Sequence, residues 1–580
     1  MYTGKNNRFV RSMFCLLLAL SMMLSMVACG ETPASTNPST DPTTAPTTAP
    51  TTEPTTEPTT EPTTEPTTEP TTVPATQPKP TQTRRKLVFE LTQEDVDEFY
   101  RLLNENEELS IAGVDLEAID ASTELLDAQY EYLGSQRTIA MILHRIDLSD
   151  DKLNQQYLDC VQICTDAYDA YMEMTRRVYL SDTPAKDYLF KDWTEQDIAM
   201  LLAYDGEIAD LSARNEEITE EYRAAKDDEM RAPLYIEFIQ NNNKIAQHYG
   251  YDNYYDYAYA MVYERDYDPE QLSVVRQFAK QYLVDAYDKS MRNFNVSIAS
   301  LSEAERNIVV DFINNTFDKT RKKYVNLYLE ALPENMAEIM NTMIKVDSVF
   351  TNSKKSDAGA FTTTIGDISF CYFGPGYYSS STVVHEAGHY YASRYTDLGA
   401  IPLDLAETHS QGNEWLFARF LKDHMADAPY ECMIDYRLYN DMTTIMLCLM
   451  IDEFESRIYS MDVTGFTAAD FDAVMESVAT QYFKMNYINE NMTDINAYWR
   501  AVVVDQPVYY ISYGVSAMAS IGLYTMAVED FDAAVEAYRI LCEEPNDELG
   551  FLGNITAAGL YGPFDEAFYT ELMELLASRG

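Results

Sequence analysis

The chain has 580 residues, enough for a large core and more than one domain, and its 94 acidic against 42 basic side chains give a net charge of −52. A nucleic-acid binder needs a basic face to displace counterions, so this balance argues against nucleic acid as a partner. It equally disfavours electrostatic attachment to an anionic membrane surface, and it favours a solvated acidic exterior.

Residues 1–28 are expected to be an export signal. Three basic residues precede an apolar run over 13–28, which is too short for a permanent membrane span. The run ends in Met26-Val27-Ala28-Cys29, which resembles a bacterial lipobox with Cys29 as the lipidated residue. We therefore expect a lipoprotein on the outer face of the bacterial cell membrane, in contact with the membrane only through its lipid anchor. Ordinary secretion, with Cys29 incidental, is the alternative.

Residues 29–84 are rich in threonine and proline, with a repeated Thr-Thr-Glu-Pro unit. Regular proline and the near absence of aliphatic side chains prevent a packed core, so this segment is expected to be an extended linker. A polyproline-like chain of this length reaches up to about 170 Å at ~3.1 Å per residue. Such a tether would hold a folded domain away from the membrane.

Residues 85–580 are predicted to form one mainly α-helical domain, with a helical part over about 85–350 and a second part over about 351–580. Capping boxes at Thr92–Asp95, Thr194–Asp197 and Ser302–Glu305 each open an amphipathic run. The best strand candidate is 361–373, which is followed by the turn residues Gly374-Pro375-Gly376. The apolar run 444–451 is soon followed by acidic residues, which indicates a core helix rather than a membrane span.

Six cysteines lie beyond the leader and its lipobox, and they form no C-x-x-C pair. Cys160 and Cys164 are one helical turn apart, a spacing that suits two buried thiols better than a structural bridge. We expect mostly free thiols, although an exported location permits disulfides.

The sequence Val384-His385-Glu386-Ala387-Gly388-His389 lies in a run, 382–395, that is predicted to be helical. Two histidines four apart stand on one helix face and can converge on one ion, and Glu386 can reach a water molecule on that ion. This H-E-x-x-H pattern is typical of zinc hydrolases, with the glutamate as general base. A chance match in a chain with six histidines is on the order of one in a few hundred, so an ordinary helix is the weaker interpretation.

A catalytic zinc site needs a third protein ligand and an open position for water. After a predicted chain reversal over 399–402, a second helix carries Glu407, Ser410 and Glu414 on one face. Glu407 is the predicted third ligand, and Glu414 is predicted to orient a ligand imidazole. His409 lies about 200° around the helix from Glu407 and is predicted to face elsewhere.

H-E-x-G-H followed by Glu407, Ser410 and Glu414 resembles the zinc site of the oligoendopeptidase F and thimet oligopeptidase family, a gluzincin-type group of metallopeptidases. Three further stretches are similar to that family, namely 250–257, 451–455 and 509–514, so the resemblance extends over most of the folded region.

The resemblance implies an almost wholly helical, two-lobed metallopeptidase with a deep channel, one Zn²⁺ on its floor and a short strand that guides the peptide backbone. His385, His389 and Glu407 would bind the zinc, and Glu386 would be the base. Tyr513, together with Tyr510, would donate hydrogen bonds to the oxyanion, whereas the alternative is that both are packing tyrosines.

The sequence departs from that family in two places. The segment between His389 and Glu407 is shorter than usual, which implies a trimmed loop beside the cleft. No histidine follows His424, although relatives carry one shortly before the tyrosines, where this chain has Val502–Val504. The second departure puts substrate positioning and catalytic efficiency in doubt, and it leaves the zinc chemistry intact.

The expected function is therefore zinc-dependent endopeptidase activity on short peptides outside the cell, by a metal-activated water. The alternative is a catalytically weak or inactive peptidase-fold lipoprotein that binds peptides or surface polymers. Retention of Glu386 beside the predicted ligands argues for the active enzyme, because a dead enzyme has no need of a general base.

Overall fold

The computed structural model describes residues 83–203, 206–313, 321–377, 379–396, 401–546 and 549–579. The predicted export signal, the linker up to residue 82, Cys29, and positions 399 and 400 of the predicted chain reversal lie outside these ranges.

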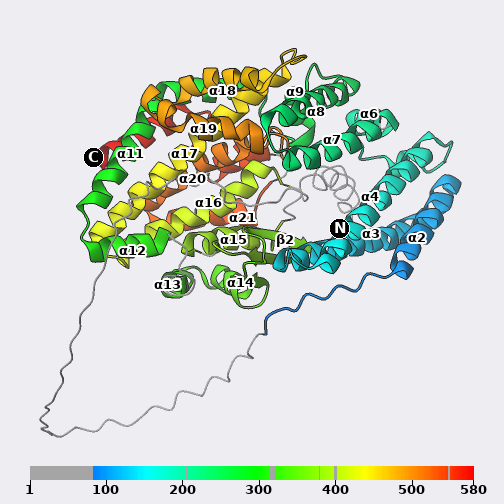
Figure 1. The fold of residues 1–580 in the computed structure, drawn as a ribbon. Coiled ribbons are helices and arrows are strands. Elements are labelled where there is room, and N and C mark those ends of the chain that lie inside the picture. Colours follow the sequence, from blue (N-terminus) through cyan, green and yellow to red (C-terminus); the bar gives the residue numbers. More distant parts are fainter. Residues whose placement is uncertain are drawn as a thin grey trace, which may run out of the picture.

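The first helices form a bundle with a core of its own. Thr92 and Thr194 accept hydrogen bonds from the Asp95 and Asp197 amides while these aspartates accept in return, so both predicted capping boxes are confirmed. The helices are α2 Gln93–Ala112, α3 Leu116–Ile146, α4 Asp151–Leu180, α5 Lys186–Leu189 and α6 Glu195–Ala203. Their apolar faces meet around Phe99, Leu126 and Tyr168, and the bundle lies at one side of the molecule (Figure 1).

A second run of helices leads to the sheet. Its elements are α7 Gly206–Ala224, α8 Asp228–His248, α9 Tyr254–Tyr257, α10 Pro269–Phe278, α11 Val284–Ser300, α12 Glu303–Ile313, α13 Asn326–Ala331 and α14 Glu334–Lys345, with the π-helical turns η1 Ala258–Val262, η2 Ala279–Leu283 and η3 Arg321–Val325. The third predicted capping box is confirmed at the start of α12, where Ser302 and Glu305 exchange hydrogen bonds.

The predicted strand segment folds as a hairpin. Strand β2 Ala360–Ile365 turns at Gly366, whose φ of 61° suits glycine, and pairs antiparallel with β3 Ile368–Phe373. A third strand that the sequence analysis missed, β1 Ser348–Phe350, pairs parallel with the other edge of β3. Aromatic side chains of β2 and β3 pack against Ile139 and Ile142 of α3, which joins the sheet to the first bundle.

The remaining helices build the largest core and carry the motif. They are α15 Ser380–Ala392, α16 Leu403–Phe420, α17 Asp427–Tyr459, α18 Ala468–Tyr482, α19 Met485–Ala501, α20 Ile511–Glu529, α21 Phe531–Glu543, α22 Gly550–Ala557 and α23 Glu566–Ser578, with the 3₁₀ turn η4 Leu421–Asp423. Helices α16, α17 and α20 lie side by side in the middle of the molecule (Figure 1).

Two apolar helices belong to this core. Within the run 444–451 of α17, residues 445–451 are buried, which confirms the prediction of a core helix. Among the described residues, α20 is long and apolar enough to cross a membrane, but 72% of its apolar window is buried inside the protein. Burial of that kind is typical of the central helix of a folded domain.

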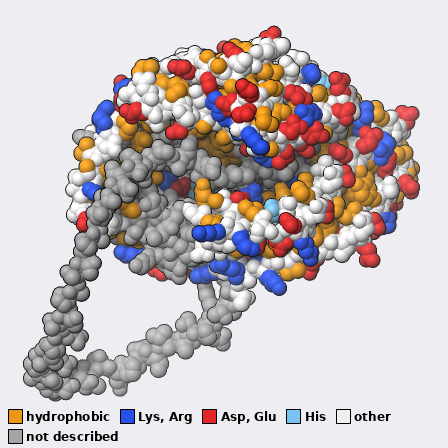
Figure 2. Space-filling model, in the orientation of Figure 1, with side chains coloured by type: hydrophobic (Ala, Val, Ile, Leu, Met, Phe, Trp, Pro, Cys, Tyr) orange, Lys and Arg blue, Asp and Glu red, His pale blue; other side chains and the backbone are white. Residues whose placement is uncertain are grey.

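The distribution of surface charge and the state of the cysteine thiols both agree with what the sequence indicates. On the face shown in Figure 2, Asp and Glu are scattered among basic and apolar side chains rather than gathered in one patch. All six cysteines of the described residues are buried and free, as predicted: Cys160, Cys164, Cys371, Cys432, Cys448 and Cys542.

Candidate metal centre

Helix α15 carries the H-E-x-x-H motif through the middle of the core. It begins at Ser380, where Ser379 caps it by accepting a hydrogen bond from the Thr382 amide at 3.0 Å, and ends at Ala392. The helix packs between the sheet, α14 and α16. His385 and His389 share the face toward α16, with ring centroids 5.1 Å apart.

Gly388 lets α15 and α16 approach backbone to backbone. A Cβ atom at this position would lie 2.4 Å from the His409 carbonyl oxygen and 2.9 Å from the Ser410 Cα. The Asn413 side chain reinforces the contact by donating a hydrogen bond to the Val384 carbonyl at 2.7 Å. The glycine of H-E-x-G-H therefore has a structural reason, since it brings the second helix within reach of the histidines.

Glu407 of α16 meets both histidines. Its Oε2 lies 3.9 Å from Nε2 of His385 and 3.9 Å from Nε2 of His389. One ligand atom from each of the three residues lies within 4.8 Å of the others. The structure thus brings together the three residues that the sequence analysis selected as ligands.

The three donors fit a zinc ion in type and spacing. Tetrahedral zinc with bonds of about 2.1 Å separates its ligands by roughly 3.4 Å, so a small contraction of the site would complete the coordination. Burial and the neighbouring His385 lower the pKa of His389 well below its ordinary value, which keeps this imidazole neutral. A neutral imidazole is the form that binds metal.

Glu414 holds the outer side of His385. Its Oε1 lies 2.8 Å from Nδ1 of that ring, an arrangement that presents Nε2 to the cluster. Its Oε2 accepts hydrogen bonds from Ser381 and, at 2.7 Å, from Arg437. Burial alone would raise the pKa of Glu414, but the Arg437 guanidinium and the His385 hydrogen bond lower it well below its usual range. Glu414 is therefore ionised and fixed.

Glu386 is completely buried beside the cluster. Its Oε2 accepts a hydrogen bond of 2.6 Å from the Thr362 hydroxyl on β2, whereas Oε1 has no hydrogen-bond partner among the described residues. Burial raises the pKa of Glu386 to about 7, against the opposing effects of His385 and the Thr362 hydrogen bond. A carboxyl group with one orphaned oxygen and a pKa near neutrality can both accept and return a proton.

His409 faces away from the cluster, as the helix geometry predicts. Its Nε2 donates to the Leu541 carbonyl in α21 at 2.9 Å. Burial lowers its pKa to about 4, so the ring is a neutral part of the core.

The two candidate tyrosines lie at the start of α20 and line a cavity of about 560 Å³ that also contains His385 and Glu414. The Tyr513 hydroxyl is 3.1 Å from that of Tyr509. The cavity wall is mainly apolar, with side chains from α16 and α17 such as Phe417 and Met433. The structure thus places Tyr510 and Tyr513 on the same cavity as His385.

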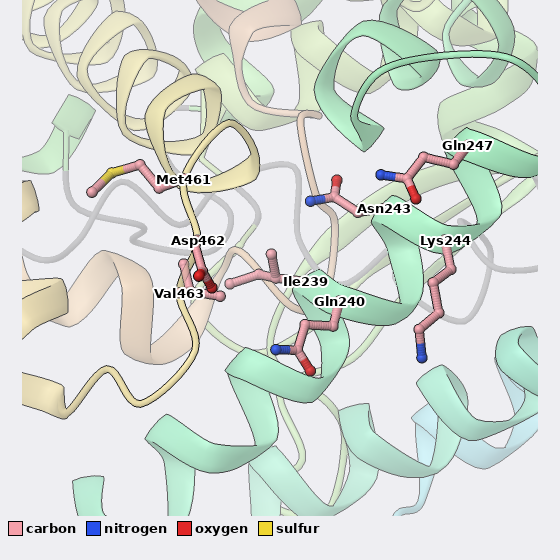
Figure 3. Close-up of a pocket in the computed structure, with 8 residues that line it drawn as sticks. All are labelled: Ile239, Gln240, Asn243, Lys244, Gln247, Met461, Asp462 and Val463. Atoms are coloured by element: carbon pink, nitrogen blue, oxygen red, sulfur yellow. The ribbon is translucent and has the colours of Figure 1, made fainter.

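A second pocket, of about 260 Å³, lies between α8 and the segment that follows α17 (Figure 3). Its amides already have partners, since Asn243 donates to the Tyr459 carbonyl and Gln240 to the Thr464 hydroxyl. The pocket holds no group of metal ligands among the described residues.

The same arrangement of helices occurs in solved peptidase structures. The structure of PZ peptidase A with an inhibitor gives a TM-score of 0.65 at 16% identity, over 84% of this chain and 98% of that chain. The chain has the oligoendopeptidase fold. A protein named as an oligoendopeptidase F from Bacillus anthracis gives 0.62 at 16% identity, over 85% and 97% of the two chains, and oligoendopeptidase F from Enterococcus faecium gives 0.50 at 13% identity, over 84% and 98%.

The likeness is one of structure, since neither a family model nor a curated protein matches the sequence. The mainly helical oligoendopeptidase fold with a short strand element beside the site, predicted from the sequence, is confirmed.

Within this oligoendopeptidase fold, sequence reasoning missed three residues that touch the centre. Ser381 lies one turn before His385 and could have been found from that spacing. Thr362 lies on a strand, and Arg437 lies on the helix after α16, so neither has a local signal. Arg437 also stacks over Trp415, with its guanidinium carbon 4.7 Å from the ring centroid.

Proposed function

We propose that the chain is a zinc-dependent endopeptidase that hydrolyses short peptides. The observation that carries this proposal is the convergence of His385, His389 and Glu407 on one point. Beside them lies the buried carboxyl group of Glu386, whose Oε1 has no hydrogen-bond partner among the described residues. The oligoendopeptidase fold supports it, because the solved structures that share the fold are named as peptidases.

The three ligand residues would hold one Zn²⁺ per chain. When bound, the ion supplies a Lewis acid and lowers the pKa of water at the site. Glu386 then takes the proton of the attacking water on Oε1, while Thr362 holds Oε2 in place. The protonated Glu386 returns that proton to the leaving amine, so the carboxyl group ends each cycle as it began.

The tyrosines act on the other side of the scissile carbonyl. A hydroxyl group of Tyr513 or Tyr510 would donate a hydrogen bond to the carbonyl oxygen as negative charge builds on it. One such donor is worth roughly 3 kcal/mol of transition-state stabilisation. Both residues line the cavity that reaches His385, as this role requires.

The substrates proposed for this site are short peptides in extended form. The cavity of about 560 Å³ has room for a few side chains rather than a folded protein, and its apolar wall suits uncharged side chains. The shape of the site therefore favours oligopeptides over intact proteins.

We also propose that the enzyme works outside the cell, tethered through Cys29 and the threonine- and proline-rich linker. The support is the sequence alone, namely the basic and apolar leader that ends in a lipobox-like cysteine. Labelling with radioactive palmitate should mark the protein, and Cys29→Ser should lose the label and release the protein into the medium. An unlabelled wild-type protein in the medium would favour ordinary secretion.

The decisive experiment combines metal analysis with cleavage of a quenched fluorescent peptide library. The wild-type protein should contain one zinc ion and cleave several peptides, whereas Glu386→Gln should keep the zinc and lose cleavage. Measurable turnover by Glu386→Gln would remove this residue as the base. Stoichiometric zinc without turnover on any peptide would refute the enzyme and leave a peptide-binding protein.

A further inference from the structure

Val508 adopts a backbone conformation that valine avoids. Its φ is +64°, in the left-handed region where a β-branched side chain crowds the backbone. Among the non-glycine residues that the structure describes, only Glu264 shares a positive φ. Val508 is buried, and it lies two residues before Tyr510, at the chain reversal that begins α20.

Both backbone polar groups of Val508 are held by buried ionisable side chains. Its N–H donates to Oε1 of Glu455 at 2.8 Å, and its carbonyl accepts from the Arg265 guanidinium at 3.0 Å. Glu455 lies on α17, whereas Arg265 precedes α10, so two segments that are distant in sequence both form hydrogen bonds with the backbone of Val508. Strain of this kind persists only where the surroundings impose it.

Arg265 is itself rigidly placed. Its guanidinium carbon lies 4.5 Å from the ring centroid of Tyr259 and 4.4 Å from that of Tyr263. The same nitrogen that holds Val508 also donates to the Ser512 hydroxyl in the first turn of α20 at 3.0 Å. Arg265 therefore fixes the reversal to the start of the helix that carries the tyrosines.

Glu455 is buried, and among the described residues no Lys, Arg or His side chain lies at hydrogen-bond distance from its carboxyl group. Burial raises its pKa well above the ordinary value, although the Val508 amide opposes the shift. A neutral carboxyl group still accepts a hydrogen bond through one oxygen, and a glutamine amide has the same shape and an equivalent acceptor.

We propose that Glu455 and Arg265 are positioning residues, which hold the Val508 reversal so that Tyr510 and Tyr513 present their hydroxyls to the cavity. The inference rests on the proposed function, because it assigns those hydroxyls to the reacting carbonyl. Without the clamp, Val508 would relax to a negative φ and redirect the segment that leads into α20. The tyrosines would remain in the protein, but their hydroxyls would miss the developing oxyanion.

The test compares Glu455→Ala with Glu455→Gln in the full-length, zinc-loaded protein. Glu455→Ala should lower kcat about 10–100-fold, which is less than the full effect of deleting an oxyanion donor. The KM should stay within about twofold of the wild-type value, and the zinc content should be unchanged. Glu455→Gln should recover most of the turnover. The matched control is Glu453→Ala on the same helix, which removes a buried carboxylate that bonds Lys280 and Tyr482 instead of Val508.

Equal losses of kcat in Glu455→Ala and Glu453→Ala would show a merely structural effect and overturn the proposal. The second measurement repeats Glu455→Ala in a Tyr510→Phe/Tyr513→Phe background, where it should cost no further turnover. An additive loss there would also overturn the proposal. If the wild-type protein hydrolyses no peptide, the proposed function itself is refuted. If the wild type is active and Glu455→Ala keeps the wild-type kcat, the positioning role alone is refuted.

Discussion

Replacing Gly388 with alanine tests whether the contact between α15 and α16 sets the spacing of the metal ligands. The new Cβ would lie 2.4 Å from the His409 carbonyl oxygen, and a real Cβ contact is essentially never shorter than 3.0 Å. Because the opposing atoms are backbone, no side-chain rotation relieves the clash. The two helices must therefore move apart, which carries Glu407 away from both histidines.

The expected cost follows from two opposing effects. Overpacking of this kind destabilises a core by about 1–3 kcal/mol, whereas alanine gains up to about 1 kcal/mol over glycine in a helix interior. The net loss of folding stability should be roughly 1–2 kcal/mol. Oε2 of Glu407 already lies 3.9 Å from Nε2 of each histidine, so further separation should weaken zinc binding by about 10–100-fold.

The assay measures zinc affinity by competition with a chromophoric chelator, alongside urea unfolding of the metal-free protein. Gly412→Ala is the matched control on α16, because the three atoms nearest to its Cβ would be side-chain atoms of Leu523 and Tyr538, at 3.2–3.5 Å. The control should retain wild-type zinc affinity. If Gly388→Ala binds zinc as tightly as the wild type, the helix contact does not set the ligand spacing and the reasoning fails.

Three other changes have defined outcomes. Glu414→Ala should weaken zinc binding about 10–100-fold in the same competition assay, because His385 loses its orienting partner and the buried Arg437 loses the carboxylate that lies 2.7 Å from it; unchanged affinity would count against that role. Thr362→Val should lower kcat with zinc retained, whereas Thr362→Ser keeps the hydroxyl and should retain turnover; equal kcat values for the two variants would contradict the assigned hydrogen bond. Burial raises the pKa of Asp127 to about 7, whereas an aspartate in the unfolded chain has its ordinary pKa near 4. Between these two pH values the folded protein holds a proton that the unfolded chain has lost, so the free energy of unfolding falls as the pH rises from about 4 to about 7. Asp127→Asn should therefore stabilise the protein by about 1–2 kcal/mol near pH 8 and change little near pH 4, in urea unfolding at the two pH values; the same effect at both would refute the titration.

Helical periodicity predicted most of the candidate site, because its key residues are encoded locally on two helices. The spacing of His385 and His389 fixes their shared face, and the spacing of Glu407 and Glu414 fixes theirs. The capping boxes were equally readable, since each needs only four consecutive residues. The sequence thus contains the parts of the site that depend on a single helix.

The contacts between elements were not readable in this way. Thr362 reaches Glu386 from a strand, and Arg437 reaches Glu414 from another helix, so only the packing of the core reveals them. The strand β1 was missed because three residues give too short an alternation. Val508 runs against its own conformational preference, and tertiary hydrogen bonds decide its backbone.

The six cysteines of the described residues are buried, so chemical labelling of their thiols can measure local opening of the fold. Cys448 lines the cavity of about 560 Å³, but the other five thiols are out of reach of a water-borne alkylating reagent in the folded state, so their labelling rates measure how often their surroundings open. Cys160 and Cys164 would report on the N-terminal bundle, Cys371 on the sheet beneath Glu386, and Cys542 on α21, which packs against α16 and α20. Mass spectrometry of the alkylated peptides would then give the order in which these regions come apart.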